Sequence, residues 1–268
     1  MGGCTHASCP MPHAPRTIAL LTDFGTRDPY VAVMKGVIAS RTDAAIADLT
    51  HEIPAFDAFE AAWFLRTTAP WWPAGTIFVC VVDPGVGTSR RIVAAECGGR
   101  IYLAPDNGLL TFIECEKLFS VENESLFLPA GSSTFHGRDR FAPVAAALAN
   151  GTAIEAVGPK IDPKSDVVRL DYAPPQYSHA SAYGTIVSID RFGNCITDLE
   201  VARVSFSPML LRIGTTMITR VERNYGDAES GPFVIVGSTG SIEISVKNAS
   251  AAEILHLRRG DRVEVIGS

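Results

Sequence analysis

The sequence has 268 residues, of which 47% are hydrophobic and 19% are charged, and its formal net charge is -6. This is the composition of a globular protein, long enough for one large domain or two modest ones with a sizeable core. The charged residues form no basic stripe, and no apolar run approaches the roughly 18 residues of a transmembrane helix, so the sequence predicts neither a nucleic-acid nor a membrane partner.

The N-terminal stretch, residues 1–16, is rich in proline, glycine and alanine and has no apolar segment like that of a signal peptide. We expect a disordered leader there. None of the six cysteines forms a C-x-x-C pair, which favours a reduced, cytoplasmic protein. Cys4, His6, Cys9 and His13 have metal-binding side chains, but their spacing matches no standard zinc pattern, so no metal site is predicted.

The region 17–150 alternates between strand and helix patterns. The expected strands are Thr17–Thr22, Ala45–Leu49, Thr76–Val82, Ile92–Glu96 and Ile101–Ala104, the last two joined by a Gly98-Gly99 turn. The expected helices are Tyr30–Ser40 with Asp28 as N-cap and Pro29 at its start, a second helix that Asp57 caps and that runs through Ala69, and Phe141–Ala149. Strands that alternate with helices predict a Rossmann-like α/β domain with a mostly parallel sheet covered on both faces.

The pattern changes after a proline-containing stretch, Asp162–Tyr177, which is typical of a linker. Short strands then dominate, and they are Tyr183–Asp190, Met209–Ile213, Phe233–Val236, Ile242–Val246 and Arg262–Ile266. One short helix is expected near Ser250–Leu257. The second half therefore predicts a small antiparallel β-barrel domain. The predicted limits are a leader at 1–16, an α/β domain at 17–172, a linker at 173–182 and a β-barrel domain at 183–268.

Two aspartates end expected strands of the first domain. Asp23 follows the first strand and Asp83 follows the most apolar one, each with a glycine close behind. Ligands of open α/β sheets bind at the carboxyl ends of the strands, and glycine lets them approach the backbone. One such Asp would be explained as a turn former, but two at equivalent strand ends favour a site.

The residues after Asp83 partly match a dinucleotide fingerprint. Gly85 and Gly87 follow a strand, but Arg90 stands where the third glycine belongs, and the next residues are strand-like. No helix N-terminus is available for a pyrophosphate, and no Walker A sequence is present, so both phosphate-binding interpretations are rejected. Taken singly, the segment 134–139 is explained as a polar turn before a helix. The segment 106–108 is likewise explained as a loop turn.

Five segments together are more specific. They are Leu21–Gly25 with the following Tyr30 and Met34-Lys35-Gly36, Val82–Thr88, Ala104–Leu110, Thr134–Asp139, and Asp190–Asn194. In this order they resemble the S-adenosyl-methionine hydrolases, or SAM hydroxide adenosyltransferases, a family that includes the fluorinase and the chlorinase. The resemblance covers about residues 17 to 268. It implies an α/β domain followed by a β-barrel, a homotrimer, and a substrate site between the first domain of one subunit and the second domain of its neighbour.

The resemblance also implies a reaction and its catalytic residues. Water would attack C5′ of S-adenosyl-methionine in line with the C5′–S bond, giving adenosine and methionine without a cofactor. The sulfonium leaves as a neutral thioether, so the difficulty lies in water, which is a poor nucleophile because it loses a proton only with difficulty. By motif match, Asp83, Arg90 and His136 position this water and favour loss of its proton.

The remaining matches imply substrate contacts. Asp23 resembles the carboxylate that binds both ribose hydroxyls, and Asp190 the group that pairs with the methionine ammonium. Phe192 resembles an adenine-stacking residue and Asn194 an adenine hydrogen-bond partner. Ser238 is matched to the amino-acid end of the substrate.

Three other functions compete with hydrolysis. A halogenase on the same substrate needs a desolvated halide pocket with no anion beside it, and halogenating relatives lack the Asp, Arg and His combination. A non-catalytic S-adenosyl-methionine sensor needs only the binding residues. A metal-dependent hydrolase is disfavoured, because no His, Asp and Glu cluster has ligand spacing. The halogenase and the sensor remain the alternatives to a hydrolase.

Overall fold

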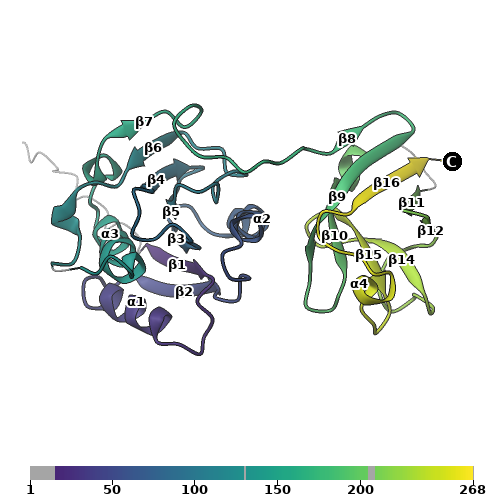
Figure 1. Ribbon diagram of the computed structural model, residues 1–268, viewed down its shortest axis with the longest axis horizontal. Helices are drawn as coiled ribbons and strands as arrows, with labels where there is room; N and C mark the ends of the chain where they lie inside the picture. Colours follow the sequence, from purple (N-terminus) through teal and green to yellow (C-terminus); the bar gives the residue numbers. More distant parts are fainter. Residues whose placement is uncertain (1–15, 130, 205–208, 268) are drawn as a thin grey trace, which may run out of the picture. The chain divides into compact units, whose positions relative to one another are not determined.

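The computed structural model describes residues 16–129, 131–204 and 209–267, and the chain divides into two compact units between Leu170 and Asp171 (Figure 1). The leader predicted at 1–16, with its cysteine and histidine residues, lies outside the described residues except for Arg16. None of the helices in the described part of the chain has the length and apolar character needed to cross a lipid bilayer.

The first unit is built on a seven-stranded sheet with the order β2-β1-β3-β5-β4-β6-β7. The strands are β1 (Thr17–Thr22), β2 (Ala45–Thr50), β3 (Ile77–Val81), β4 (Ile92–Cys97), β5 (Arg100–Pro105), β6 (Lys117–Ser120) and β7 (Lys160–Ile161). The pairings make β2, β1, β3, β5 and β6 point in one direction, and β4 and β7 in the other. The prediction of a mostly parallel sheet is confirmed.

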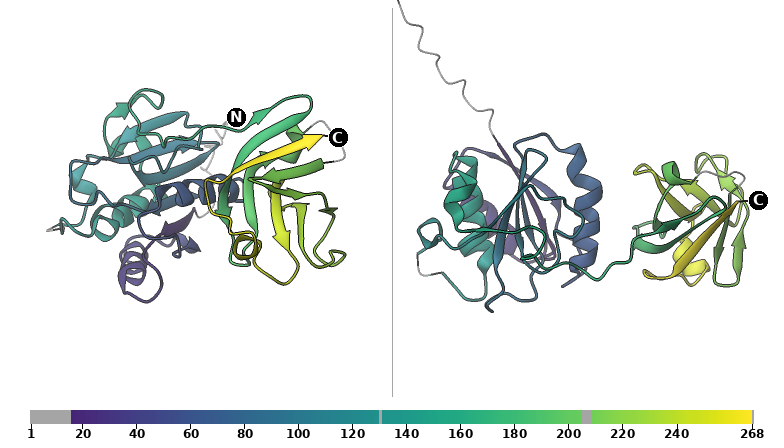
Figure 2. Two further views of the ribbon diagram at one scale, coloured as in Figure 1. Left: turned by 45° about the vertical axis from the view of Figure 1, so that its right-hand side comes forward. Right: turned by 90° about the horizontal axis from the view of Figure 1, so that it is seen from above.

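Helices cover both faces of this sheet (Figure 2). They are α1 (Tyr30–Ala39), α2 (Ala58–Thr68) and α3 (Ala142–Ala149). Ile18 and Leu20 of β1 pack in one core with α1 and α3, while Ala19 and Leu21 pack in the other core with α2. Successive strand side chains point to opposite faces, so a strand covered on both sides must be apolar throughout.

Of the two predicted aspartate caps, one is confirmed and the other is wrong. Asp57 caps α2 as expected, because its side chain accepts a hydrogen bond from the Glu60 amide. Asp28 does not cap α1; Pro29 occupies the cap position with φ -75° and ψ -2°, and no side chain caps the helix. Proline already holds a helical φ, so the chain enters the helix at Pro29 and Asp28 is left outside it.

The start of α3 also differs from the prediction. This helix begins one residue later than expected, at Ala142, and a π-helical turn, Gly137–Phe141, precedes it. Such turns are rare and often lie at functional sites. The predicted motif Thr134–Asp139 therefore runs into a π-helical turn that continues directly into α3.

The second unit is a curled, half-barrel sheet of nine strands. Its order is β12-β11-β16-β9-β10-β15-β14-β13, with β8 beside β9. The strands are β8 (Gln176–Tyr177), β9 (Ser181–Ile189), β10 (Cys195–Glu200), β11 (Met209–Ile213), β12 (Thr216–Ile218), β13 (Val221–Glu222), β14 (Pro232–Val236), β15 (Ser241–Val246) and β16 (Arg262–Gly267). All pairings are antiparallel except that of β13 with β14. The predicted antiparallel β domain is confirmed.

The curl of this sheet comes from its longest strand. The first part of β9 pairs with β16 and its last part with β10, so β9 belongs to both halves of the sheet. The stretch 173–182, predicted as a linker, contains β8 and the first residues of β9. The one α-helix among the described residues of this unit, α4 (Ala251–Ile254), is shorter than predicted and is capped by Ser250.

Candidate functional site

The two strand-end aspartates of the first unit lie at one edge of the sheet. β1 and β3 are adjacent and parallel, so the residues that follow them emerge side by side. Asp23 Oδ2 accepts a hydrogen bond of 2.8 Å from the Phe56 amide. Burial raises the pKa of Asp83 and the charge of Asp23 adds to this rise, as expected for neighbouring carboxylates. We call Asp23, Asp83, Arg90 and His136 the first-unit cluster.

Asp83 and Arg90 form a buried ion pair. Their side chains are 4% and 10% exposed, and Arg90 Nη2 donates to Asp83 Oδ2. The Gly85 amide donates to Asp83 Oδ1 at 3.2 Å. Burial raises the pKa of Asp83, although Arg90 and Gly85 oppose that shift. A carboxylate with a raised pKa is a better proton acceptor than an ordinary one.

The loop between Asp83 and Arg90 is held by a close backbone approach. Gly87 has φ +81°, and a Cβ atom there would lie 2.5 Å from the Ser133 carbonyl oxygen. Only glycine fits both the left-handed conformation and the space. This contact brings the loop against the segment that leads to His136.

His136 is 4% exposed and lies at the start of the π-helical turn. Burial lowers the pKa of His136, and the guanidinium groups of Arg140 and Arg90 lower it further. This shift favours the neutral imidazole near pH 7. Two buried polar atoms of the cluster, Arg90 Nε and His136 Nδ1, have no hydrogen-bond partner among the described residues. Buried polar atoms are normally paired, so these two are candidates for contact with water or a ligand.

Asp83 and His136 line the same pocket, which has a volume of about 360 Å³. Its walls include Phe24, Tyr30 and Phe135, whose ring centroids lie 5.3 to 6.0 Å apart. An apolar pocket with a few convergent polar groups is the usual form of a small-molecule site.

Sequence reasoning missed Phe56. Its side chain is 70% exposed, its φ is +69°, and its amide is the group bound by Asp23. An aromatic residue with positive φ is uncommon and costs conformational energy, so such strain is often found at functional sites. The sequence carries no signal for it, because the φ angle depends on the contact with Asp23, 33 residues earlier in the chain.

In the second unit, Asp190 organises a tight turn. Its Oδ1 accepts hydrogen bonds of 2.9 Å from the amides of Phe192 and Asn194, and its Oδ2 accepts one of 2.8 Å from Asn194 Nδ2. Gly193 has φ +82°, and a side chain there would collide with Ser250. The turn leaves the Phe192 ring 76% exposed while Asn194 is buried.

These three residues line one pocket of about 870 Å³, together with Tyr225, Lys247 and Ser250. Ser238 does not line it; it lies in the turn between β14 and β15. We call this cavity the second-unit pocket.

A buried acid lies beside Asp190. Glu243 of β15 is 8% exposed, and burial and the charge of Asp190 raise its pKa. The Tyr225 hydroxyl donates to Glu243 Oε2 at 3.5 Å. Sequence reasoning missed Glu243 as well, because a single acidic residue within an expected strand looks like an ordinary surface-facing position.

The described residues contain no group of three or more histidine, cysteine, aspartate or glutamate side chains that could hold a metal ion.

Residues 18–158 match the family profile described as the SAM hydroxide adenosyltransferase N-terminal domain, and residues 184–264 match that of the C-terminal domain. The chain belongs to the SAM hydroxide adenosyltransferase family.

The curated relatives of this chain include (R)-S-adenosyl-L-methionine hydrolases and fluorinases. The (R)-S-adenosyl-L-methionine hydrolase of Thermus thermophilus is 39% identical over 94% of this chain and 100% of its own. That of Salinispora tropica is 34% identical over 92% of this chain and 97% of its own. The fluorinase of Actinopolyspora mzabensis is 29% identical over 94% of this chain and 97% of its own.

Two solved structures share the fold. A crystal structure of an uncharacterized conserved protein from Thermotoga maritima has a TM-score of 0.85 and 33% identity, covering 93% of this chain and 99% of the other. A crystal structure of a conserved hypothetical protein from Thermus thermophilus has a TM-score of 0.78 and 38% identity, covering 94% of this chain and 100% of the other. The two-unit architecture is thus common to these proteins and to this member of the SAM hydroxide adenosyltransferase family.

Proposed function

We propose that this enzyme hydrolyses S-adenosyl-L-methionine to adenosine and L-methionine. The observation that carries the proposal is the Asp83 carboxylate, which is held in a buried ion pair by Arg90 and lines the same pocket as the imidazole of His136. Curated relatives named (R)-S-adenosyl-L-methionine hydrolase, at 31 to 39% identity, support it.

The chemistry needs a positioned nucleophile and no general acid. The water oxygen forms a bond to C5′, the C5′–S bond breaks, and its electron pair goes to sulfur, which leaves as a neutral thioether. One proton is released from water. Holding the water in line removes much of the entropic barrier, and a nearby base favours loss of its proton.

The first-unit cluster suits these tasks. Asp83, with its raised pKa, or the neutral His136 accepts or steers the proton. Arg90 fixes the carboxylate and stabilises hydroxide character on the water. Asp23 binds the ribose hydroxyls through the acceptor positions that its contact with the Phe56 amide leaves free.

The second-unit pocket suits the two ends of the substrate. The exposed ring of Phe192 offers a stacking surface for adenine. Asn194 gives its amide hydrogen to Asp190, so its side-chain oxygen is left to accept from the adenine amino group. The Asp190 carboxylate lines the pocket and has Glu243 beside it, and it suits the methionine ammonium. Ser238 is assigned to the amino-acid end by resemblance alone.

The proposal extends to assembly and location. By family resemblance the enzyme is a homotrimer whose sites are completed by a neighbouring subunit, and it needs no cofactor. A cytoplasmic location is supported by the free thiols of Cys80, Cys97, Cys115 and Cys195, since disulfides are rare in reducing compartments. Sedimentation velocity of the purified protein tests the trimer.

The test of the reaction is incubation of the purified protein with S-adenosyl-methionine in oxygen-18 water without halide, followed by mass spectrometry. Adenosine with one labelled oxygen, together with methionine, is the expected result. 5′-Halo-adenosine that forms only with added chloride or fluoride would replace the proposal with a halogenase. Tight binding of the substrate without any product would replace it with a sensor.

A further inference from the structure

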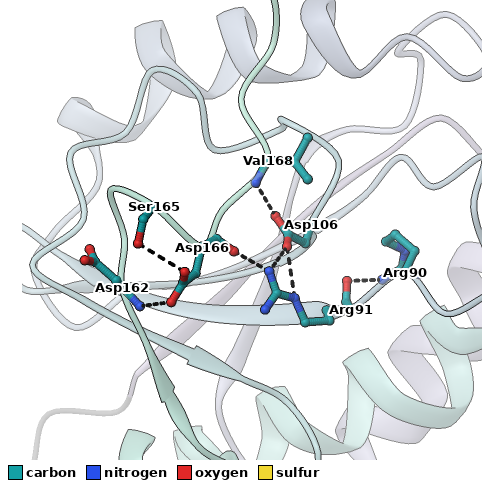
Figure 3. A network of polar contacts seen from close by, with 7 residues as sticks. All are labelled: Arg90, Arg91, Asp106, Asp162, Ser165, Asp166 and Val168. Carbon is teal, nitrogen blue, oxygen red and sulfur yellow. Dashed lines mark hydrogen bonds and ion pairs between the residues drawn. The ribbon is translucent and has the colours of Figure 1, made fainter.

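The Arg90 guanidinium forms a hydrogen bond to the backbone as well as the ion pair with Asp83. Its Nη1 donates to the Arg91 carbonyl oxygen at 2.6 Å, and the Asp106 amide donates to the same oxygen at 2.9 Å. Figure 3 shows Arg90, Arg91 and Asp106 in one network. The Arg91 carbonyl thus joins the guanidinium of the first-unit cluster to the residue that follows β5.

The side chains of Arg91 and Asp106 also bind each other, in addition to the backbone hydrogen bond between these residues. Arg91 Nε and Nη2 donate to Asp106 Oδ2 at 3.2 and 2.7 Å. The Asp106 side chain is 3% exposed, whereas that of Arg91 is 39% exposed, so the carboxylate is the buried partner of this contact. A buried carboxylate needs its acceptor positions filled, and a planar guanidinium fills them with a fixed geometry. The position of the Arg91 backbone is therefore set by Asp106.

Asp106 also holds the segment 162–168, which lies shortly before the boundary between the units. Its Oδ1 accepts a hydrogen bond of 2.8 Å from the Val168 amide, and Arg91 Nη2 also donates to the Asp166 carbonyl oxygen. The Asp166 carboxylate accepts from the Asp162 amide and the Ser165 hydroxyl, which closes the turn (Figure 3). The contacts run continuously from this segment to Arg90.

We propose that Asp106 is a positioning residue for the Arg90–Asp83 pair and that it ties this pair to the segment 162–168. The inference rests on the proposed function, because positioning matters only if the pair acts on water. A purely structural Asp106 would stabilise the first unit without affecting how Arg90 meets Asp83. The two roles differ in what a variant does to the pH profile.

The test compares Asp106→Asn with Glu96→Gln. Asparagine keeps an acceptor for the Val168 amide but loses the charge that fixes Arg91. Glu96→Gln breaks the ion pair with Lys117, near the other end of β4, and is the matched control. In Asp106→Asn we expect kcat to fall about 10- to 100-fold, as for partners that orient other catalytic groups, with little change in KM. The control should retain the wild-type kcat.

The pH profile separates positioning from stability. Arg90 opposes the rise in the pKa of Asp83, while burial and the charge of Asp23 favour it. A loosened Arg90 therefore raises the pKa of Asp83 further and moves the acid limb of kcat/KM to higher pH in Asp106→Asn. An unchanged limb and an unchanged kcat, at a temperature where the variant is folded, would overturn the inference. If this variant does not fold, Arg91→Met provides the same comparison while it retains the Arg91 carbonyl.

A crystal structure of Asp106→Asn measures the positioning without turnover. Displacement of Arg90 from Asp83 supports the inference, and an intact pair overturns it. Wild-type protein that gives no adenosine would count against the proposed function alone, since the crystal structure still decides whether Asp106 sets the pair.

Discussion

Replacing Asp83 by asparagine tests the centre of the proposed mechanism. The substitution keeps the size of the side chain and removes its charge. A base or orienting group that acts on the nucleophile contributes about 10²- to 10⁴-fold to the rate, so kcat should fall by that factor. The substrate contacts assigned to Asp23 and to the second-unit pocket are untouched, so the dissociation constant for S-adenosyl-methionine should change little.

The same variant also predicts a loss of stability. The Asp83 and Arg90 side chains are 4% and 10% exposed, so the variant leaves a buried cation without its counter-ion. Breaking a buried ion pair on one side costs about 3–5 kcal/mol, and asparagine, which still accepts a hydrogen bond, should stay at or below the lower end. Removing the second charge as well, in Asp83→Asn with Arg90→Met, should restore part of the loss in stability without restoring turnover.

The assay combines single-turnover formation of adenosine, substrate binding by calorimetry and thermal unfolding for wild type and the two variants. Full activity of Asp83→Asn would refute the role of the carboxylate. A double variant that is less stable than the single one would refute the argument that an unpaired Arg90 causes the destabilisation.

Three further predictions concern residues around the two pockets. The acid side of the kcat/KM profile should contain a second ionisation besides that of Asp83, below about pH 6.5, because burial lowers the pKa of His136 and its neutral form is the active one; His136→Asn should remove this second ionisation and leave the limb set by Asp83. Gly87→Ala should lower the free energy of unfolding by about 1–3 kcal/mol more than Gly151→Ala does. Both glycines have positive φ, but of the two only Gly87 faces a carbonyl oxygen within 4 Å, so equal melting temperatures of the two variants would rule out the clash. Phe192→Ala should raise KM about tenfold or more with kcat little changed, whereas Met217→Ala, at an exposed position on β12, should leave KM as in wild type.

Elements with a strong local cause could be predicted from the sequence. β3 is an unbroken apolar run because both of its faces are covered, and Asp57 caps α2 because an aspartate three residues before Glu60 can reach its amide. The strand pattern placed Asp23 and Asp83 at the ends of two strands, while the adjacency of these parallel strands is known only from the sheet order. In these elements the deciding contact joins residues close in the sequence, or the same residue type recurs along the whole element.

Features that depend on distant contacts could not be predicted. β10 carries Asp198 within a buried strand, which is possible because Thr185 and Tyr172 donate hydrogen bonds to that carboxylate. Asp106 has the sequence pattern of a turn residue, yet its partners include Val168, 62 residues later in the chain. No local pattern encodes such partners, so sequence reasoning left Asp106 without a role.

Charge distinguishes the proposed hydrolase from the halogenase alternative. Burial raises the pKa of Asp83 in the first unit and that of Glu243 in the second, and the charges of Asp23 and Asp190, respectively, add to these shifts. Each carboxylate pair makes its immediate surroundings more negative, although in the first unit the Arg90 guanidinium partly offsets this. Such regions attract a substrate that carries a sulfonium and an ammonium, and they repel a halide. A halide site beside Asp83 would first need that carboxylate to be neutralised, so removal of the charge in Asp83→Asn is the change most able to admit chloride. Chloride-dependent 5′-chloro-adenosine from that variant, and none from wild type, would show that this one charge excludes the halide.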